Sequence, residues 1–390
     1  MRHLRYALPL FALIGCTGNA TGETGATPAV QGDARPFRVQ EIADFDQPWA
    51  MTFLPDGSAL VTERRGRLVH WSRQGNENRT AAVAGVPEVD YGGQGGLGDV
   101  VLHPNFAQNG LVYLSWVEPA QGGLRGAVVG RARLLATSAA MPGAPAGYSL
   151  DGLQVIWRQD PKQDGQGHYS HRIAFGPDGK LYISSGERQE FDPAQDPNGN
   201  LGRIVRLNDD GTVPADNPWA SRGGIGAQAW TMGNRNVLGL AFAPDGSLWG
   251  AEMGPRGGDE LNRLGRQSNH GYPIVSDGDH YNGQSIPDHA TRPEFDAPEI
   301  VWTPVISPSS MIFYSGNAFP QWRGNALIGA LSGQGIVRVH INGNRAREVE
   351  RYDFGARIRE VEQAADGSIY VLEDERGSSQ GRLLKLVPAR

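Results

Sequence analysis

One short phrase recurs along the chain and constrains the fold more than any other feature. It consists of an apolar residue, a turn built on Asp-Gly or a similar pair, and a short apolar strand. Asp-Gly supplies the positive φ that tight hairpins need, and proline fixes the start of the turn. Four copies are clear and two are degenerate: FLPDGSALV (53–61), FGPDGKLYI (175–183), FAPDGSLW (242–249), ADGSIYV (365–371), HPNF…NGLVYL (103–114) and FPQWRGNALI (319–328).

Six similar hairpins, spread rather evenly along the chain, predict an all-β, six-bladed β-propeller over residues 37–390. A single small sheet cannot bury both of its faces, but sheets stacked around an axis can. The end segments 37–42 and 382–387 are expected to pair and close the ring. Long insertions at 119–170, 188–234 and 253–312 are expected as inter-blade loops at one mouth, where function usually resides. The alternative, a β-sandwich with coincidental turns, is disfavoured by the number of copies.

Composition excludes several other classes of protein. Glycine and proline number 54 and 26 among 390 residues, about a fifth of the chain, which rules out a helical bundle as the bulk of the fold. A hydrophobic content of 39% is too high for a disordered chain. The net charge of −6 argues against a nucleic-acid partner, since such proteins usually present a basic surface.

The N-terminus is typical of a targeting segment. Arg2 and Arg5 precede a short apolar run that ends at Cys16, the one cysteine of the chain. Such a run is too short to span a bilayer and resembles a bacterial lipoprotein signal peptide over residues 1–16, although a plain secretory signal is the alternative. Residues 17–36 are small and polar and are interpreted as a flexible tether. The expected location is the periplasmic side of a bacterial cell envelope, with membrane contact only through a lipid anchor on Cys16.

Two glycine-rich segments differ in what they indicate. Residues 93–98 match G-x-G-x-x-G, but a strand rather than a helix is predicted after them, which excludes a dinucleotide site. Such a loop still lets backbone approach a flat ligand closely. Residues 254–260, GPRGGDE, follow a predicted strand and offer carbonyl oxygens, which suit Ca²⁺. A structural turn with solvated acids is the alternative there.

Two histidines and three arginines stand just before predicted inner strands. His168 and His171 precede the copy at residue 175, and a histidine at the start of a blade can reach the axis as a general base. Arg235 precedes the copy at 242, and Arg357 and Arg359 precede the last copy. Arginines at equivalent places in different blades converge at one mouth and indicate an anionic, carboxylate-bearing ligand. Taken singly, each of these residues is also compatible with an ordinary surface position.

Together these pieces resemble the soluble, pyrroloquinoline quinone (PQQ) dependent aldose sugar dehydrogenases of the glucose/sorbosone dehydrogenase family. The likeness extends from about residue 37 to residue 387. It rests on Gln94 before LHPNF (102–106), His168 before Arg172, LGRIVRLN (201–208), GNRN (233–236), EMGPRGGDE (252–260), NHGYP (269–273), Trp302 before SPSS (307–310), and Arg357 with Arg359.

The resemblance implies roles for particular residues. His168 would be the general base, with Glu187 as the acid that orients it and Arg235 as a catalytic partner. The positions that would contact PQQ are Gln94, Arg235, Asn236, Trp302, Arg357 and Arg359. The carbonyls of Gly254 and Pro255 would hold a Ca²⁺ that also binds PQQ, and Glu260, with backbone from Ser276 and Gly278, would form a second, structural Ca²⁺ site. Some family members place a lysine on PQQ where this chain has LSGQG (331–335), and Met253 replaces a polar side chain.

The hypothesis for the reaction is oxidation of an aldose at C1 to its lactone, with the C1 hydroxyl proton passing to His168 and hydride passing to C5 of PQQ. The electron acceptor downstream would be a quinone or a cytochrome. Two alternatives stay open at this point: a Ca²⁺-dependent lactonase on the same architecture, and a non-catalytic envelope protein that only binds ligands.

Overall fold

The strands form six small antiparallel sheets, which we call blades 1 to 6. The computed structural model describes residues 35–137, 147–377 and 379–389. Blade 1 contains β2 (Pro48–Phe53), β3 (Ala59–Glu63), β4 (Arg67–Gln74) and β5 (Glu77–Ala82). Blade 2 contains β6 (Leu97–Leu102), β7 (Leu111–Pro119), β8 (Arg125–Thr137) and β9 (Gly147–Arg158). Blade 3 contains β10 (Ser170–Phe175), β11 (Leu181–Ser185) and β12 (Arg203–Leu207).

The second half of the chain supplies the other three blades. Blade 4 contains β13 (Val237–Phe242), β14 (Leu248–Glu252), β15 (Asp259–Arg263) and β16 (Ile300–Trp302). Blade 5 contains β17 (Pro308–Phe313), β18 (Ala326–Ala330), β19 (Gly335–Asn342) and β20 (Arg345–Asp353). Blade 6 contains β21 (Ile358–Gln363), β22 (Ile369–Glu373), β23 (Arg382–Pro388) and β1 (Phe37–Asp44).

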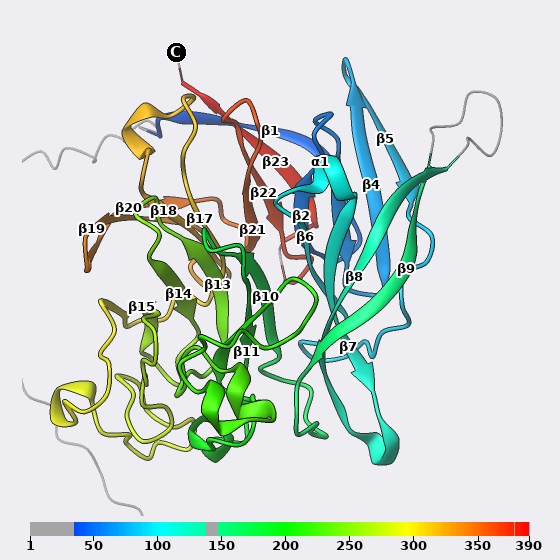
Figure 1. Ribbon diagram of the computed structural model, residues 1–390. Coiled ribbons are helices and arrows are strands. Elements are labelled where there is room, and N and C mark those ends of the chain that lie inside the picture. Colours follow the sequence, from blue (N-terminus) through cyan, green and yellow to red (C-terminus); the bar gives the residue numbers. More distant parts are fainter. Residues whose placement is uncertain (1–34, 138–146, 378, 390) are drawn as a thin grey trace, which may run out of the picture. The chain divides into compact units, whose positions relative to one another are not determined.

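The first strands of consecutive blades pack against one another in a closed ring. β2 contacts β6, and the contacts continue through β10, β13, β17 and β21 back to β2. A ring of six sheets closed in this way is a six-bladed β-propeller, which confirms the fold expected from the sequence (Figure 1). The first strand of each blade is therefore its innermost strand.

Each copy of the recurring phrase joins the innermost strand of a blade to the second strand. In blade 1 the Asp56 carboxylate accepts hydrogen bonds from the backbone N–H of Ser58 at 2.9 Å and from its hydroxyl at 2.6 Å. Gly57, between them, has φ +83°, a conformation that favours glycine. Asp245 and Gly246 repeat this arrangement in blade 4. The clear copies recur because blades 1, 3, 4 and 6 make this same tight turn, whereas the degenerate copies of blades 2 and 5 are longer connections.

Apolar side chains fill the spaces between neighbouring blades. The second strands β3, β11, β14, β18 and β22 are buried along their whole length, so both faces of these sheets are covered. One cluster of buried residues lies between each pair of adjacent blades, including the pair formed by blades 6 and 1. Stacking around the axis thus provides the core that no single sheet could provide.

The two ends of the propeller pair with each other, as the sequence predicts. β1 runs antiparallel to β23, and Phe37 is opposite Pro388 at one end of the register (Figure 1). Blade 6 therefore combines one strand from the start of the propeller with three from its end. This pairing joins the first and last parts of the ring by backbone hydrogen bonds.

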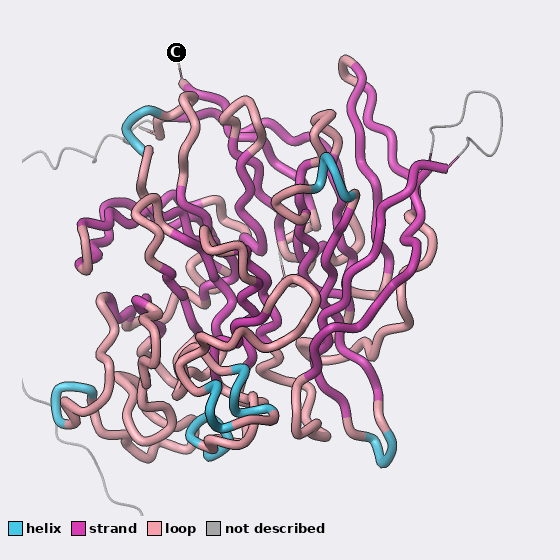
Figure 2. The backbone as a smooth tube through the Cα atoms, in the orientation of Figure 1, coloured by secondary structure: helices cyan, strands magenta, loops and turns pink. Residues whose placement is uncertain are grey.

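The predicted insertions contain more regular structure than expected. Residues 119–170 include the long strands β8 and β9, which complete blade 2, so this insertion is largely not a loop. The helical segments are short and lie in connections outside the strands (Figure 2). They are α1 (Phe106–Asn109) and the 3-10 turns Gln121–Gly123, Asp192–Gln195, Ala220–Arg222, Ile225–Gln228, His289–Thr291 and Pro320–Trp322.

The expectations for the N-terminus concern residues outside the described ones. The signal peptide over 1–16, Cys16 and the tether from 17 to 34 all belong to this part of the chain. Within the described ranges, every helix is too short or too polar to cross a bilayer.

One buried arginine touches the innermost strand of all five other blades. Arg172 lies in β10, and it is 6% exposed. Its contacts are the ring of Trp49 in β2 (4.0 Å to the centroid), Asp99 in β6 (3.3 Å), the Leu238 carbonyl in β13 (2.9 Å), the Ser309 carbonyl in β17 (2.7 Å) and Glu360 in β21 (2.6 Å). The guanidinium group thus connects the six blades at the axis.

Replacement of this arginine should destabilise the ring. In Arg172→Met, the buried carboxyl of Asp99 loses its counter-charge, and breaking a buried ion pair costs about 3–5 kcal/mol. The loss in free energy of unfolding, measured by urea titration, should be larger at pH 8 than at pH 5, because an uncompensated carboxyl is buried more easily when protonated.

Arg345→Met serves as the matched control, since the Arg345 side chain is 89% exposed. Its effect should stay within about 0.5 kcal/mol at both pH values. Equal stability of the two variants would contradict the role of Arg172 at the axis.

Candidate functional site

A cavity of about 220 Å³ lies at the mouth where the innermost strands begin; we call it the axial cavity. Every blade, or the loop that leads into it, contributes to the lining, so segments far apart in sequence meet here. The lining residues are Trp49, Arg64, Gly93, Gln94, Tyr169, Ser170, His171, Leu238, Met253, Ser307, Leu331, Arg357, Arg359, Asp374 and Arg376.

Arginines dominate the charge of the axial cavity. Four arginines line it, and Asp374 is the acid among the lining residues. Asp374 Oδ2 accepts from Arg359 Nη2 at 2.8 Å and from Arg357 Nη2 at 3.3 Å. Burial opposes ionisation of Asp374, but the charges of Arg359 and Arg357 hold its pKa below the usual value. The surplus of positive charge suits a ligand with several carboxylates.

A buried donor in this cavity lacks a partner. Burial lowers the pKa of Arg359 to about 10, so the guanidinium stays charged at neutral pH. Its Nε is buried and finds no hydrogen-bond acceptor among the described residues. Because an unsatisfied buried donor is costly, the natural acceptor is an anionic group of a ligand.

A second cavity, of about 230 Å³, is lined partly by the same segments; we call it the side cavity. Residues 168–171 and 253–255 contribute to both linings. The side cavity is lined by His168, Glu187, Gln189, Phe191, Arg235, Pro255, Tyr272, His280, Tyr281 and Asn282. Its lining combines the imidazole of His168, the carboxylate of Glu187 and the guanidinium of Arg235 with four further aromatic rings.

His168 and Glu187 form a hydrogen-bonded pair in the side cavity. His168 Nδ1 bonds to Glu187 Oε1, and Glu187 is fully buried at the end of blade 3's second strand. A carboxylate can only accept, so Nδ1 carries the proton and Nε2 keeps its lone pair. Burial lowers the pKa of His168, and the bond to Glu187 opposes this change. His168 is therefore a neutral imidazole near neutral pH, with a free lone pair on Nε2 as a general base requires.

Gln94 connects the two cavities. Its side-chain Oε1 accepts from the backbone N–H of His168 at 2.9 Å, while the residue itself lines the axial cavity. Its own backbone N–H donates to the Gln166 carbonyl at 2.8 Å. Gln94 thus fixes the backbone that carries His168.

The backbone around His168 and Glu187 is strained. His168, Ser170 and His171 have φ values of +46°, +57° and +57°, in the left-handed region that residues with a side chain rarely adopt. Just after Glu187, positive φ values recur at Arg188, Gln189 and Phe191. Glu187 Oε2 accepts the Phe191 N–H at 2.9 Å, so one carboxylate holds both segments. Strain gathered in this way is typical of functional sites.

Arg235 lies between His168 and the turn at Gly254. Its Nη1 donates to the Met253 carbonyl at 2.8 Å and to the Gly254 carbonyl at 2.5 Å. The Glu252 carboxylate accepts its backbone N–H at 2.7 Å, which positions the residue. Its Nε is buried without a partner among the described residues, like that of Arg359. Pro255 lines the side cavity beside it.

Two predicted cofactor positions lie away from both cavity linings. Asn236 is fully buried behind them, where its Oδ1 accepts from Ser170 Oγ at 2.9 Å. Trp302 is in β16, the outermost strand of blade 4, and its Nε1 donates to Glu348 at 2.7 Å. The structure does not bring Trp302 to the cavities, because these are lined at the innermost strands.

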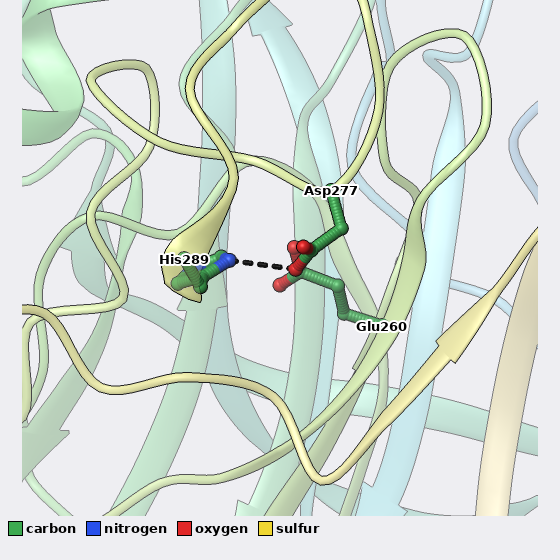
Figure 3. Close-up of side chains that lie close together, drawn as sticks. All are labelled: Glu260, Asp277 and His289. Carbon is green, nitrogen blue, oxygen red and sulfur yellow. Dashed lines mark hydrogen bonds and ion pairs between the residues drawn. The ribbon is translucent and has the colours of Figure 1, made fainter. Parts of the chain in front are cut away.

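Glu260 lies in a separate cluster with Asp277 and His289. One potential ligand atom from each residue lies within 4.8 Å of the others, and the three side chains converge (Figure 3). Burial and the nearby Glu252 raise the pKa of Glu260 well above its usual value. Ser276 and Gly278 flank Asp277 in the chain, and the Gly278 N–H donates to Ser276 Oγ at 3.3 Å. Asp277, the acid between these two residues, brings its side chain to Glu260.

Two potential ligand atoms of the cluster face each other as acceptors. His289 Nε2 donates to the His270 carbonyl at 3.0 Å, so Nδ1 of the neutral ring has a lone pair and no proton. That nitrogen lies 2.8 Å from Asp277 Oδ2, another acceptor. Two acceptors at this distance need a hydrogen-bonding proton or a metal ion between them.

Sequence reasoning missed Arg64, Tyr272, Tyr281, Asp277 and His289. Arg64 directly follows β3, and Arg357 directly precedes β21. The position of Arg64 at the end of a blade strand could therefore have indicated a place in the cavity lining. The others lie in the long connection after β15, which has no periodicity that would indicate spatial proximity. Asp277, between the two residues singled out for their backbone, was the most accessible of them.

Comparison with known proteins assigns the family. The glucose/sorbosone dehydrogenase family model matches residues 45–385. The aldose sugar dehydrogenase YliI of Escherichia coli (strain K12) is 38% identical over 351 residues, which cover 88% of this chain and 90% of YliI.

Solved structures agree with this result. A crystal structure described as glucose dehydrogenase is 40% identical, with a TM-score of 0.82 and coverage of 90% of this chain and all of that one. The PQQ-bound aldose sugar dehydrogenase of Streptomyces coelicolor, 24% identical with a TM-score of 0.71 over 90% of this chain and 98% of that one, shares the fold. From its sequence and its propeller alike, the chain belongs to the glucose/sorbosone dehydrogenase family.

Proposed function

We propose that the protein oxidises aldose sugars at C1 to the lactone with PQQ as cofactor. The observation that carries this proposal is the oriented His168–Glu187 pair in the side cavity, next to an arginine-lined cavity. Membership of the family and the name of YliI support an aldose as substrate. The Streptomyces relative is described as PQQ-bound. This description and the arginines of the axial cavity together support PQQ as the cofactor.

The axial cavity fits a tricarboxylated planar quinone. Arg64, Arg357 and Arg359 offer charged donors at its wall, and the orphaned Nε of Arg359 has the chemistry to bind a carboxylate. Arg235 has a second orphaned Nε near His168, suited to a quinone oxygen that gains negative charge. When bound, PQQ supplies the two-electron acceptor that takes hydride from C1.

The chain's own residues would manage the proton and the sugar. His168 Nε2 takes the proton of the C1 hydroxyl, and Glu187 holds the ring so that this nitrogen faces the side cavity. Tyr272 and Phe191 provide ring faces against which the apolar face of a pyranose can pack. The proton of the C1 hydroxyl would thus be held on Nε2 of His168 while Glu187 keeps the ring in place.

Calcium is proposed at two places. The Gly254 carbonyl already accepts from Arg235, but a carbonyl has a second lone pair for a metal. Because the guanidinium repels a cation, Ca²⁺ there depends on the negative charge of the cofactor. Glu260 and Asp277 fit a second Ca²⁺ through their carboxylates, whereas the nitrogen of His289 is also a ligand for zinc.

Removal of the base should slow turnover strongly but leave the cofactor bound. His168→Ala should lower the rate of sugar-dependent dye reduction by about 10²–10⁴-fold, since general-base catalysis is typically worth that factor. Purified protein is supplied with PQQ, Ca²⁺, a sugar panel and an artificial dye. Unchanged turnover in the variant would exclude His168 as the base, and lactone opening without PQQ in the wild-type protein would favour a lactonase.

The pH profile should reveal the role of Glu187. The hydrogen bond from His168 to Glu187 favours the charged imidazolium, so Glu187→Gln should lower the pKa of His168 further. The acid limb of the pH–rate profile, where protonation of His168 stops the reaction, should therefore move to lower pH, while the plateau rate falls through poorer orientation. A limb that stays in place or moves to higher pH would contradict the pairing.

Metal binding at Glu260 should be visible as stability. Millimolar Ca²⁺ should stabilise the wild-type protein by about 2.7 kcal/mol at a hundredfold excess over Kd and so raise its melting temperature, and Glu260→Gln should remove this rise. In the presence of a chelator the variant should be no less stable than wild type, because it relieves repulsion between buried carboxylates.

Glu77→Gln, at an exposed side chain, is the control and should respond to Ca²⁺ as wild type does. A larger rise with Zn²⁺ than with Ca²⁺, lost in the same variant, would show that the cluster prefers a transition metal.

A further inference from the structure

His171 lines the axial cavity, and the proposed reaction does not use it. It is 2% exposed and has no carboxylate partner among the described residues, in contrast to His168. Its ring lies 5.0 Å from the Trp49 ring, with 15° between their planes. Two flat side chains from blades 1 and 3 thus form a stacked layer at the floor of the cavity.

The contacts of His171 determine which ring nitrogen carries the proton. The Asp99 backbone N–H donates to Ser115 Oγ at 2.7 Å, so the serine oxygen already acts as an acceptor. Ser115 Oγ lies 2.8 Å from His171 Nδ1, the one acceptor that the described residues offer to the hydroxyl proton, so this proton is directed at Nδ1. Nδ1 accepts, and the proton of the neutral ring resides on Nε2, the ring nitrogen left for a ligand in the cavity.

The chain makes room for this imidazole. A Cβ on Gly98 would lie 2.0 Å from His171 Cε1 and 2.4 Å from Nδ1, so only glycine fits there. Gly98 has no positive φ, and it is therefore the ring, not the backbone conformation, that requires glycine. His171 itself holds φ +57°, a conformation that costs about 1–3 kcal/mol. Such an arrangement is difficult to explain as simple packing.

We propose that His171 is a cofactor-contacting residue that presents a neutral Nε2–H donor, on a rigid Trp49–His171 layer, to the planar anionic ligand of the axial cavity. The inference rests on the proposed function, because it takes PQQ as that ligand. The other polar groups at the wall include several guanidinium charges; His171 adds a directed donor without adding charge.

Neutrality follows from the surroundings of the ring. Burial and the adjacent Arg172 lower the pKa of His171 to about 3. Arg188 and Arg64 act in the same direction. The residue therefore keeps one proton on one nitrogen through the physiological pH range, and it neither donates that proton nor takes up a second.

The test is binding of PQQ by the full chain in the presence of Ca²⁺, followed by calorimetry and by the absorption spectrum of the bound cofactor. His171→Phe keeps a ring on Trp49 but loses the donor, and His171→Ala loses both. Both should weaken binding about tenfold or more and shift the spectrum, as expected for loss of a hydrogen bond to a charged group. His340→Ala, at an exposed position on β19, is the control and should bind as wild type does.

Gly98→Ala provides an independent route to the same result. Its methyl group should displace the imidazole and weaken binding in wild type but have no further effect in His171→Ala, a non-additivity that a purely structural defect would not produce. Circular dichroism verifies that each variant is folded. Wild-type affinity in His171→Phe, or additive effects of the two substitutions, would overturn the proposal while leaving the proposed function intact. Failure of the wild-type protein itself to bind PQQ would overturn both.

Discussion

The guanidinium of Arg172 is the interaction on which the rest of the structure depends. Six sheets can pack side by side without any residue at the axis, but their relative tilt is then determined only by apolar contacts between neighbours. Arg172 meets the innermost strand of each of the other blades through a carbonyl, a carboxylate or an aromatic ring. Hydrogen bonds to carbonyls are directional, so this residue adds a fixed geometry to contacts that are otherwise tolerant of small shifts.

That fixed point also positions the candidate site. His168 and His171 precede Arg172 by four residues and one residue, and the intervening backbone is held in left-handed conformations. A strained segment keeps its conformation only when both of its ends are anchored. Arg172 anchors one end, while Gln94 and Glu187 hold the other through the backbone and ring of His168. The base of the proposed reaction is thus held by the same residue that centres the propeller.

The fold was predictable because blades 1, 3, 4 and 6 repeat one tight Asp-Gly turn between the innermost and the second strand. In blade 1 the Asp56 carboxylate accepts the Ser58 N–H, and Gly57 adopts a positive φ. Both are local properties that the residue types reveal. The closing pair β1 and β23 was also predictable, since unpaired extended ends need partners. The same local reasoning could not foresee that residues 119–170 contain two long strands, because their pairing depends on partners within blade 2.

Site residues were predictable where they stand at blade starts and not elsewhere. Arg357 directly precedes β21 and Arg359 is its second residue, and this position takes both to the axial cavity. Trp302 was associated with the site through a motif, but its place on an outermost strand takes it to the core beside blade 5. Asp277 and His289 reach Glu260 through an irregular connection, whose course follows from tertiary contacts such as the paired backbones of Arg256 and Asp279. Sequence spacing contains no information about contacts of that kind.

Charge is distributed unevenly along the axis, and this gives the two mouths different chemistry. Arg64, Arg357, Arg359 and Arg376 line the axial cavity, whereas Asp99, Glu360 and Glu362 line a cavity of about 350 Å³ at the opposite mouth. Burial raises the pKa of Glu360 to about 8, so this carboxyl is largely neutral at pH 7 and the acidic mouth holds less charge than its composition suggests. Arg172 lies between the two groups and is compensated by Asp99. The arginines of the axial cavity, in contrast, have Asp374 as their acidic partner in that lining and retain a surplus of positive charge. An anionic cofactor is therefore favoured at one mouth only, the mouth where Glu187 orients the imidazole of His168.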